Sequence, residues 1–279
     1  MISYVGSKSD REKQMRSTSS SAYPSDLTLK QWAIIQPYFP RRKKVGRKRK
    51  HSFRVIFNAI LYVVRSGCAW RMLPKDYPPY QTVYGYFRKW KVNDLWKRVT
   101  DRLRQRTRVQ AGRDPNPSAA IIDSQSVKSG ELRDDVGYDG YKRIKGRRRH
   151  ALVDVLGLPI DISVTAASVQ ERTEAAAMFE RVKGKMPRLK KIWADGGYTG
   201  PLVDWVRRKC GWDLEIIKPT SPEPGFHVRP WCWIVERTFG WLTKYRRFAR
   251  DYELTTTSSE ALIRIAMIRN MACRLARSA

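Results

Sequence analysis

The first hundred residues alternate between apolar stripes with helical spacing and short basic or proline-containing breaks. These stripes predict four helices, which run from Thr28 to Pro40, from Ser52 to Gly67, after Pro79 and over 93–110. Glycine and two prolines then interrupt the pattern within 112–117. We therefore expect a small all-α domain over 23–111, with 112–117 as a linker.

Beyond the linker the pattern changes to short apolar runs that are typical of strands. Strands are predicted over 119–123, 150–156, 160–166, 189–195 and 213–219, and helices over 171–184, 200–209, 231–247 and 259–276. This order, with a hairpin after the first strand and helices between the later ones, is typical of an α/β fold whose mixed sheet is flanked by helices. We expect this domain over 118–279, and a disordered tail over the polar, serine-rich residues 1–22.

Composition adds a polyanionic partner to this picture. Lys and Arg number 56 against 26 Asp and Glu, which gives a formal net charge of +30. Solubility does not require such a charge, and nucleic acid is the partner that it favours. We expect no membrane association and a cytoplasmic protein, because the chain lacks both an apolar run of about 18 residues and the apolar core of a signal peptide. The four cysteines are scattered without a C-x-x-C pair, which argues against a zinc finger.

Three acidic residues stand at positions that suit catalysis. Asp123 ends one apolar strand, Asp195 ends another, and Glu236 lies within a predicted helix, WIVERTFGWL. Carboxylates that converge at the edge of an α/β sheet offer oxygen ligands of the kind that Mg²⁺ or Mn²⁺ prefers. Two such ions can support an in-line attack on phosphate. The glycines after Asp195 would also let the backbone approach a ligand closely.

Each acid has a plainer interpretation. A single carboxylate at a strand end is more often a solvated residue or a salt-bridge partner, and Glu236 has Arg237 and Arg246 as candidate partners. Two other strand acids, Asp154 and Asp161, are interpreted as facing outward. The spacing alone therefore leaves both structural and catalytic roles open.

Several motifs together resemble the insertion-sequence transposases of the DDE class, in particular the insertion-sequence-five family, from Tyr23 to the C-terminus. They are YPSDLT, ILYVVRSGCAWRMLP, PPYQTVYGYFRKW, AAIIDSQSVKSGE, IKGRRRHALVDVLGLP, ADGGYTG, and WIVERTFGWLTKYRR followed by RDYE. The resemblance implies a helical DNA-binding region, a ribonuclease-H-like catalytic domain, and a catalytic, metal-binding triad of Asp123, Asp195 and Glu236. It also implies two Mg²⁺ (or Mn²⁺) ions per active site, binding to terminal inverted repeats, nicking of element ends, and joining of 3′-hydroxyls to target DNA. Pairing two element ends requires at least a homodimer.

The chain departs from the family pattern along the Glu236 helix. Members of the family often carry an Arg four residues before this glutamate and a Lys seven residues after it, whereas this chain has Cys232 and Thr243. Arg229 and Lys244 lie nearby but on different faces of the helix. These departures keep open the alternative of a catalytically silent DNA-binding protein derived from a transposase. A plain nuclease that never joins ends is a third hypothesis.

Basic residues supply the candidate DNA contacts. Nine of the residues over 41–54 and six of those over 142–149 are Lys or Arg, and the third helix could enter the major groove as in a helix-turn-helix motif. An ordinary helical bundle with a polar outer face is the alternative. Trp231 and Trp233 are candidates for stacking on bases. The predicted contacts are Arg41, Arg42, Lys43, Lys44, Arg47, Lys48, Arg49, Lys50, Gln81, Tyr84, Arg88, Lys89, Lys142, Lys145, Arg147, Arg148, Arg149, Arg229, Arg237 and Lys244.

Overall fold

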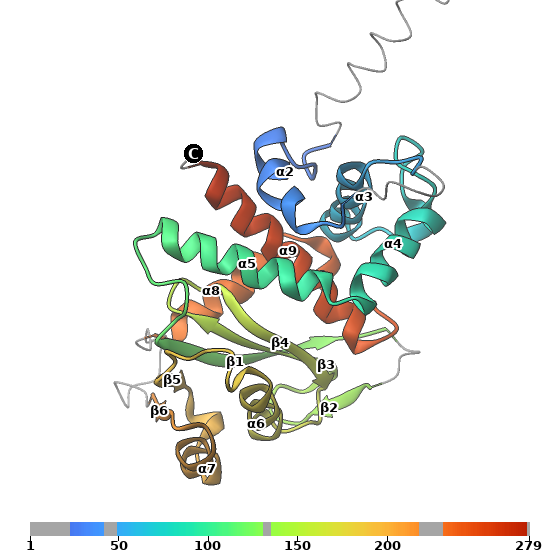
Figure 1. The fold of residues 1–279 in the computed structure, drawn as a ribbon. Helices are drawn as coiled ribbons and strands as arrows, with labels where there is room; N and C mark the ends of the chain where they lie inside the picture. Colours follow the sequence, from blue (N-terminus) through green and yellow to red (C-terminus); the bar gives the residue numbers. More distant parts are fainter. Residues whose placement is uncertain (1–22, 42–48, 131–134, 218–230, 278–279) are drawn as a thin grey trace, which may run out of the picture.

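A mixed sheet with helices on both faces forms the centre of the computed structural model, which describes residues 23–41, 49–130, 135–217 and 231–277 (Figure 1). The predicted tail over 1–22 lies outside the described residues. The helices are α2 (Leu29–Ile35), α3 (Phe53–Ser66), α4 (Tyr80–Val92), α5 (Leu95–Gln110), α6 (Glu171–Val182), α7 (Pro201–Cys210), α8 (Cys232–Leu242) and α9 (Thr256–Arg277). The strands are β1 (Ala119–Lys128), β2 (Gly137–Asp139), β3 (Ile144–Asp154), β4 (Pro159–Ala166), β5 (Lys191–Ala194) and β6 (Asp213–Ile216). In these described ranges, no helix is long and apolar enough to cross a bilayer.

The N-terminal helices begin and end where the sequence signals place them. Thr28 and Gln31 form a reciprocal capping box at the start of α2, and Ser52 accepts a hydrogen bond from the Val55 amide at the start of α3 (3.2 Å). Gly67 ends α3 in the left-handed region, with φ of 75°, which glycine adopts without the steric cost of a Cβ. The prediction of an all-helical N-terminal region is confirmed.

The sheet has the strand order β2–β3–β1–β5–β6, with β4 also paired to β3. Neighbours in the β1, β3 and β4 meander run antiparallel, whereas β1, β5 and β6 run parallel. This is a ribonuclease-H-like arrangement, and the predicted mixed α/β fold is confirmed. Two details differ from the prediction. β1 continues five residues beyond Asp123 to Lys128, and β3 begins at Ile144, six residues before the predicted start at 150.

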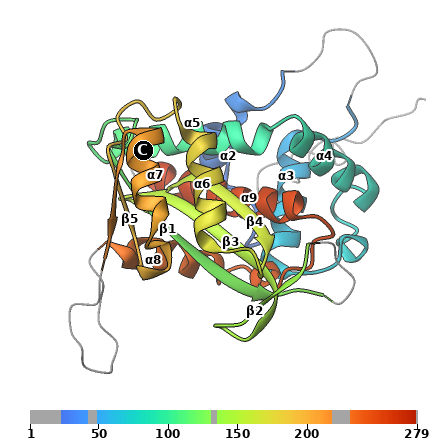
Figure 2. The same cartoon turned by 90° about the horizontal axis from the view of Figure 1, so that it is seen from below.

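Alternation of side chains along the strands divides the core into two layers. Ile121 and Val153 face the layer that contains α5, α8 and α9, whereas Ala120, Ile122 and Leu152 face α6 and α7. Successive residues of a strand point to opposite faces, so this parity assigns a face to every position of β1. Figure 2, seen from below, shows α6 and α7 on one face of the sheet and α9 on the other.

The N-terminal helices share the α8–α9 layer of the core with the sheet. One hydrophobic cluster includes Phe57 of α3, Val99 of α5, Ile121 of β1 and Ile265 of α9, and α9 packs against α5 and α2. The buried area that holds the helical region in place is therefore contributed partly by the last helix of the chain. That residues 112–117 form a linker between two domains stays a prediction.

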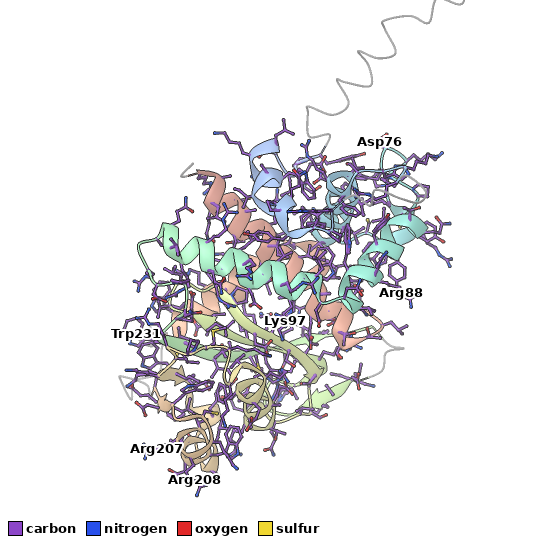
Figure 3. The ribbon with its side chains drawn as sticks, in the orientation of Figure 1. Asp76, Arg88, Lys97, Arg207, Arg208 and Trp231 are labelled. Carbon is purple, nitrogen blue, oxygen red and sulfur yellow. The ribbon has the colours of Figure 1, made fainter. Side chains whose placement is uncertain are left out.

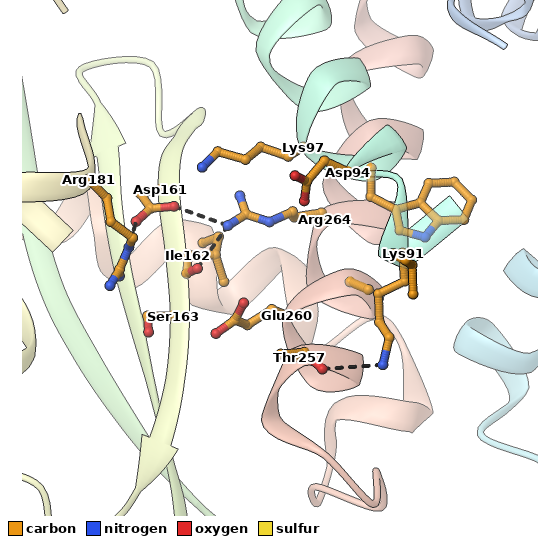
Figure 4. A pocket seen from close by; sticks show the side chains of 13 residues that line it. Lys91, Asp94, Lys97, Asp161, Ile162, Ser163, Arg181, Thr257, Glu260 and Arg264 are labelled. Carbon is orange, nitrogen blue, oxygen red and sulfur yellow. Dashed lines mark hydrogen bonds and ion pairs between the residues drawn. The ribbon is translucent and has the colours of Figure 1, made fainter. Parts of the chain in front are cut away.

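Asp154 and Asp161 face inward, so the interpretation that they point outward was wrong. Asp154 is fully buried and pairs with Arg108 of α5 (2.5 Å). Asp161 accepts from Arg181 and from Arg264 of α9, both at 3.0 Å, beside a cavity of about 440 Å³ (Figure 4). Buried carboxylates need such partners because desolvation penalises an unpaired charge. The three ion pairs tie α5, α6 and α9 to the β3–β4 hairpin.

Gly146 of β3 lies directly against the backbone of the neighbouring strand β1. A Cβ at this position would come within 1.9 Å of the Val127 carbonyl oxygen, which is backbone and cannot rotate away. We expect Gly146→Ala to lower the free energy of unfolding by about 1–3 kcal/mol or more, as overpacked cores do. Gly140→Ala is the matched control, because no heavy atom lies within 4 Å of its Cβ position. Urea unfolding of both variants checks this expectation, and equal stabilities would contradict it.

Candidate active site

The strand register brings Asp123 and Asp195 to neighbouring positions of the sheet. Ala119, Ala120 and Ile121 of β1 pair in parallel with residues 191, 192 and 193 of β5, so the difference in residue number is the same for every pair. Asp123 and Asp195 each lie two residues farther along, and the backbone of Asp195 is still extended (φ −81°, ψ −178°). The two carboxylates therefore occur at the same level of adjacent strands, as expected for two ligands of one site.

Both aspartates face the side of the sheet that α8 covers. Ile121 and Trp193 pack into the cluster that also contains Ile234 and Val235 of α8, and a shift of two residues along a strand preserves the face. The Asp195 carboxylate accepts a hydrogen bond from the Gly197 amide (2.9 Å). Asp123 lies within β1 rather than at its end, which corrects the prediction, because β1 continues as the partner of the basic half of β3.

The electrostatic environment of Asp123 favours a bound cation or a proton. The pKa of Asp123 is raised to about 7, mainly by burial and also by the nearby charges of Asp195 and Glu171, against the opposing effects of the Ser124 amide and Lys142. The amide of Ser124 donates to Asp123 Oδ1 (2.7 Å). The charged form of this buried carboxyl is therefore costly unless a cation neutralises it.

Glu236 lies on α8, which packs against β1. Ile234 and Val235 anchor the helix, whereas the Glu236 side chain is exposed. Arg237 was a candidate salt-bridge partner of Glu236. Its guanidinium instead donates to the Leu156 carbonyl (3.3 Å) and lies over the Trp233 ring. Among the residues that the structure describes, no three acidic, histidine or cysteine side chains are close enough to hold one metal ion. The structure therefore brings the two aspartates together, and it leaves Glu236 outside their immediate group.

Two tryptophans fix the start of α8 against the second aspartate strand. Trp231 stacks on Trp193 of β5, with ring centroids 4.6 Å apart and planes inclined by 8°. Trp193 is two residues before Asp195, so this stack sets the distance between α8 and the end of β5. Trp231 and Trp233 each remain 43% exposed, and their predicted stacking on bases stays a prediction.

Sequence reasoning missed two side chains near the aspartates, Glu171 and Tyr198. Glu171 lies in the first turn of α6 and accepts a hydrogen bond from the Ser124 hydroxyl (2.5 Å). Tyr198 is fully buried within the short turn η3 (Gly196–Tyr198). The ADGGYTG motif contains Tyr198 and could have indicated it. No spacing in the sequence connects Glu171 to Asp123, because the two meet only through the packing of α6 on the sheet.

The predicted basic contacts fall into three groups. Arg42, Lys43, Lys44, Arg47, Lys48 and Arg229 lie outside the described residues. Those that lie on the surface are Arg41, Arg49, Lys50, Gln81, Tyr84, Arg88, Lys89, Lys142, Lys145 and Lys244, and Arg237 is partly buried. The third group, Arg147, Arg148 and Arg149, is buried within β3.

The buried arginines correct the interpretation of 142–149 as a uniformly exposed basic run. Arg147 contacts Asp251 (3.2 Å) and Arg149 contacts the Phe248 carbonyl (3.0 Å), both about a hundred residues away, whereas Arg148 contacts Asp139 of the neighbouring strand β2 (2.6 Å). These contacts satisfy the charges inside the protein, so we exclude the three residues from the proposed DNA surface.

Comparison with known proteins identifies the family. The family model "Transposase DDE domain" matches residues 114–271, which is more than half of the chain. The chain belongs to the DDE transposase family. A second model, "Putative transposase of IS4/5 family", matches residues 27–100, the helical region. The resemblance stated from the sequence motifs is confirmed.

Two curated relatives from Burkholderia cepacia are similar to this DDE family member over part of its length. One, "Putative transposase for insertion sequence element IS402", is 27% identical over 115 residues, which cover 39% of this chain and 54% of that protein. The other, "Insertion element IS402 uncharacterized 16.2 kDa protein", is 29% identical over 104 residues, which cover 35% of this chain and 69% of that protein. The match thus spans about half the length of the first relative.

The two departures from the family pattern lie at opposite ends of α8. Cys232 is buried at the first turn. Thr243 caps the C-terminal end, where its hydroxyl donates to the Gly240 carbonyl (2.8 Å). Lys244 follows directly and is exposed, while its carbonyl accepts from Arg65. The DDE family member therefore uses these two positions for packing and helix capping.

The raised pKa of Asp123 predicts a pH-dependent stability of the metal-free protein. Between the usual value of 3.8 and about 7, the folded protein holds a proton that the unfolded chain has released. The contribution of Asp123 to the free energy of unfolding therefore falls as pH rises through this window. We expect Asp123→Asn to remove this part of the pH dependence. Urea unfolding in EDTA at about pH 5 and about pH 8 compares the two proteins, and parallel profiles would contradict the expectation.

Proposed function

We propose that the protein is a DNA transposase that nicks the ends of its element by metal-dependent hydrolysis and joins the freed 3′-hydroxyls to target DNA. The register pairing of Asp123 and Asp195, on the face covered by α8 in a member of the DDE family, is the observation that carries this proposal. Glu236 is the third proposed catalytic and metal-binding residue, and it extends from the helix that covers the same face. DNA as substrate places the reaction at the nucleoid, in the bacterial cytoplasm.

The donor set fits Mg²⁺ or Mn²⁺. Asp123 and Asp195 present only oxygen ligands, and the raised pKa of the buried Asp123 indicates that its charged form is costly until a cation neutralises it. When bound, two such ions activate a water or a 3′-hydroxyl and stabilise the leaving oxygen. The chain itself holds Asp123 through the Ser124 amide and Asp195 through the Gly197 amide. Both carboxylates are thus oriented before any ion binds.

The proposed DNA surface is the outer face of α4. Gln81, Tyr84 and Arg88 recur at helical spacing and are exposed, while Val83 and Phe87 face the core. In Figure 3, Arg88 points away from the body of the protein. Arg49 lies over the Phe53 ring at the start of α3 (3.6 Å) and would contact phosphates beside this face. This arrangement supports a helix-turn-helix mode of binding to the terminal inverted repeats.

Arg88→Ala tests this surface. We expect weaker binding to element-end DNA by about 1–3 kcal/mol if Arg88 contacts a base edge, together with reduced preference over unrelated DNA. The matched control is Arg208→Ala, another exposed arginine on a helix, which lies on α7 well away from α4 in Figure 3. Fluorescence anisotropy at one fixed salt concentration measures both. Equal losses for the two variants would exclude α4 as the specific surface.

The experiment that tests the proposed function uses labelled element-end DNA, a target plasmid, and either Mg²⁺ or EDTA. We expect nicked ends and joined products with Mg²⁺ and neither with EDTA. Nicks without joined products would support a plain nuclease, and tight DNA binding without any product would support a silent DNA-binding protein. Sedimentation of the complex with paired ends tests the proposed homodimer or larger assembly.

A further inference from the structure

Glu171 reaches the two aspartates from the opposite face of the sheet. Its Oε1 accepts the hydrogen bond from Ser124, the residue after Asp123. Its Oε2 lies 2.5 Å from the position that a Cβ on Gly197 would occupy, and Asp195 Oδ1 lies 3.1 Å from the same position. Glu171 and Asp195 therefore share Gly197 as a common neighbour. The first turn of α6 thus adds a third carboxylate beside the paired aspartates.

The cations near Glu171 do not neutralise it at close range. Lys142 Nζ lies 4.0 Å and Arg148 Nη1 lies 3.9 Å from Glu171 Oε1, which is the outer limit of an ion pair. Arg148 is instead committed to Asp139, at 2.6 Å. The carboxylate of Glu171 is only partly exposed, at 20%. Its negative charge therefore adds to the field at the aspartate pair.

Tyr198 provides a second and independent observation. Its side chain is fully buried, and its hydroxyl has no hydrogen-bond partner among the residues that the structure describes. Burial raises the pKa of this hydroxyl, and the charges of Asp123, Glu171 and Asp195 also raise it, while Arg148 opposes them. A buried hydroxyl without a partner is costly, and such groups mark sites that bind water or an ion. The hydroxyl is thus a buried donor on the side of the sheet that α6 covers, three residues after Asp195, and no described residue accepts its proton.

We propose that Glu171 and Tyr198 are positioning residues of the divalent-ion site. Glu171 accepts hydrogen bonds from water molecules of a hydrated ion that Asp123 and Asp195 hold, and Tyr198 donates to the same group of carboxylates and waters. Mg²⁺ retains several waters when one or two carboxylates bind it, so outer residues that orient this water contribute to affinity. This inference rests on one part of the proposed function, namely that Asp123 and Asp195 bind the ion.

The test measures Mn²⁺ binding to the full chain without DNA, by electron paramagnetic resonance of the free ion. We expect Glu171→Gln and Tyr198→Phe to weaken binding by about tenfold or more, as removal of outer-shell partners does. Glu174→Gln is the matched control, because Glu174 also lies in the first turn of α6 but pairs with Arg181 (2.9 Å). Its Mn²⁺ affinity should equal that of the unsubstituted protein.

Thermal melting separates this role from a merely structural one. The amide oxygen that Glu171→Gln introduces could still accept from the Ser124 hydroxyl. The metal-free variant should therefore melt at or above the temperature of the unsubstituted protein, and Mn²⁺ should raise that temperature less. A lowered melting temperature with unchanged Mn²⁺ affinity would overturn the inference.

If Asp123→Asn loses Mn²⁺ binding and Glu171→Gln does not, the inference is wrong and the proposed function stands. If the unsubstituted protein binds no Mn²⁺, the proposed metal chemistry itself is wrong.

Discussion

Asp123→Asn and Asp195→Asn are each expected to keep DNA binding and lose strand cleavage and joining by roughly a thousandfold or more. A metal ligand that stabilises charge in the transition state is worth several kcal/mol, and each 1.4 kcal/mol corresponds to about a tenfold change in rate. Asparagine preserves the shape of each side chain, and it removes a carboxylate oxygen and the negative charge with which the side chain would bind a divalent ion. Single-turnover cleavage of element-end DNA with Mg²⁺ measures the loss.

Glu236→Gln completes this series. Glu236 is exposed on α8, so it acts in catalysis only if it moves to the ion when DNA binds. We expect a loss as large as that of the two aspartate variants if DNA binding brings Glu236 to the ion. Asp204→Asn is the matched control, since Asp204 is an exposed acid on α7. Full activity of Asp123→Asn or Asp195→Asn would contradict the assignment of the site.

Asp154→Ala is expected to cost about 3–5 kcal/mol of the free energy of unfolding. Asp154 pairs with Arg108 at 2.5 Å in a fully buried position, and its other oxygen accepts from the amides of Leu156 and Leu158. Its charge also acts on Arg237 and Arg274. Removing it leaves buried positive charge without its counter-ion and detaches α5 from the end of β3. Denaturant unfolding, followed by far-UV circular dichroism, measures the change.

The matched control for this pair is Asp114→Ala. Asp114 forms a salt bridge of the same length with Arg188, but both side chains are nearly half exposed, so its loss should cost less than about 1 kcal/mol. Asp154→Asn keeps the acceptor for the two amides and gives an intermediate value if Asp154→Ala does not fold. A cost for either Asp154 variant as small as that of Asp114→Ala would show that the pair does not hold the helical region to the sheet.

Local patterns in the sequence predicted most of the elements correctly. The caps of α2 and α3 depend on neighbouring residues, and the alternation in β4 reflects one buried hairpin, so both are visible within a few positions. The same holds for Asp195, because its strand and its glycines are adjacent in the chain. The sequence placed Asp123 and Asp195 at the ends of two strands, and this predicted that they lie beside each other at one edge of the sheet. β1 is longer than its apolar part, so Asp123 lies within the strand.

Long-range charge pairing explains what the sequence could not predict. Arg147 and Arg149 are buried in β3 with partners, Asp251 and the Phe248 carbonyl, that lie about a hundred residues away. Asp154 and Asp161 are buried in the same way, with partners on α5 and α9. Glu171 escaped notice because only the packing of α6 against β1 brings it to Ser124. A polar pattern in the sequence cannot distinguish a solvated charge from one paired across the fold.

Iron-mediated cleavage of the protein chain tests most directly whether Asp123, Asp195 and Glu236 form one metal site. Fe²⁺ bound in place of Mg²⁺ generates hydroxyl radicals with ascorbate and peroxide, and these radicals cut the backbone close to the ion. With element-end DNA present, we expect fragments that end near Asp123, Asp195 and Glu236, and none of them in Asp123→Asn or in excess Mg²⁺. Cuts confined to other segments, or cuts that persist in Asp123→Asn, would contradict a shared metal site at these carboxylates.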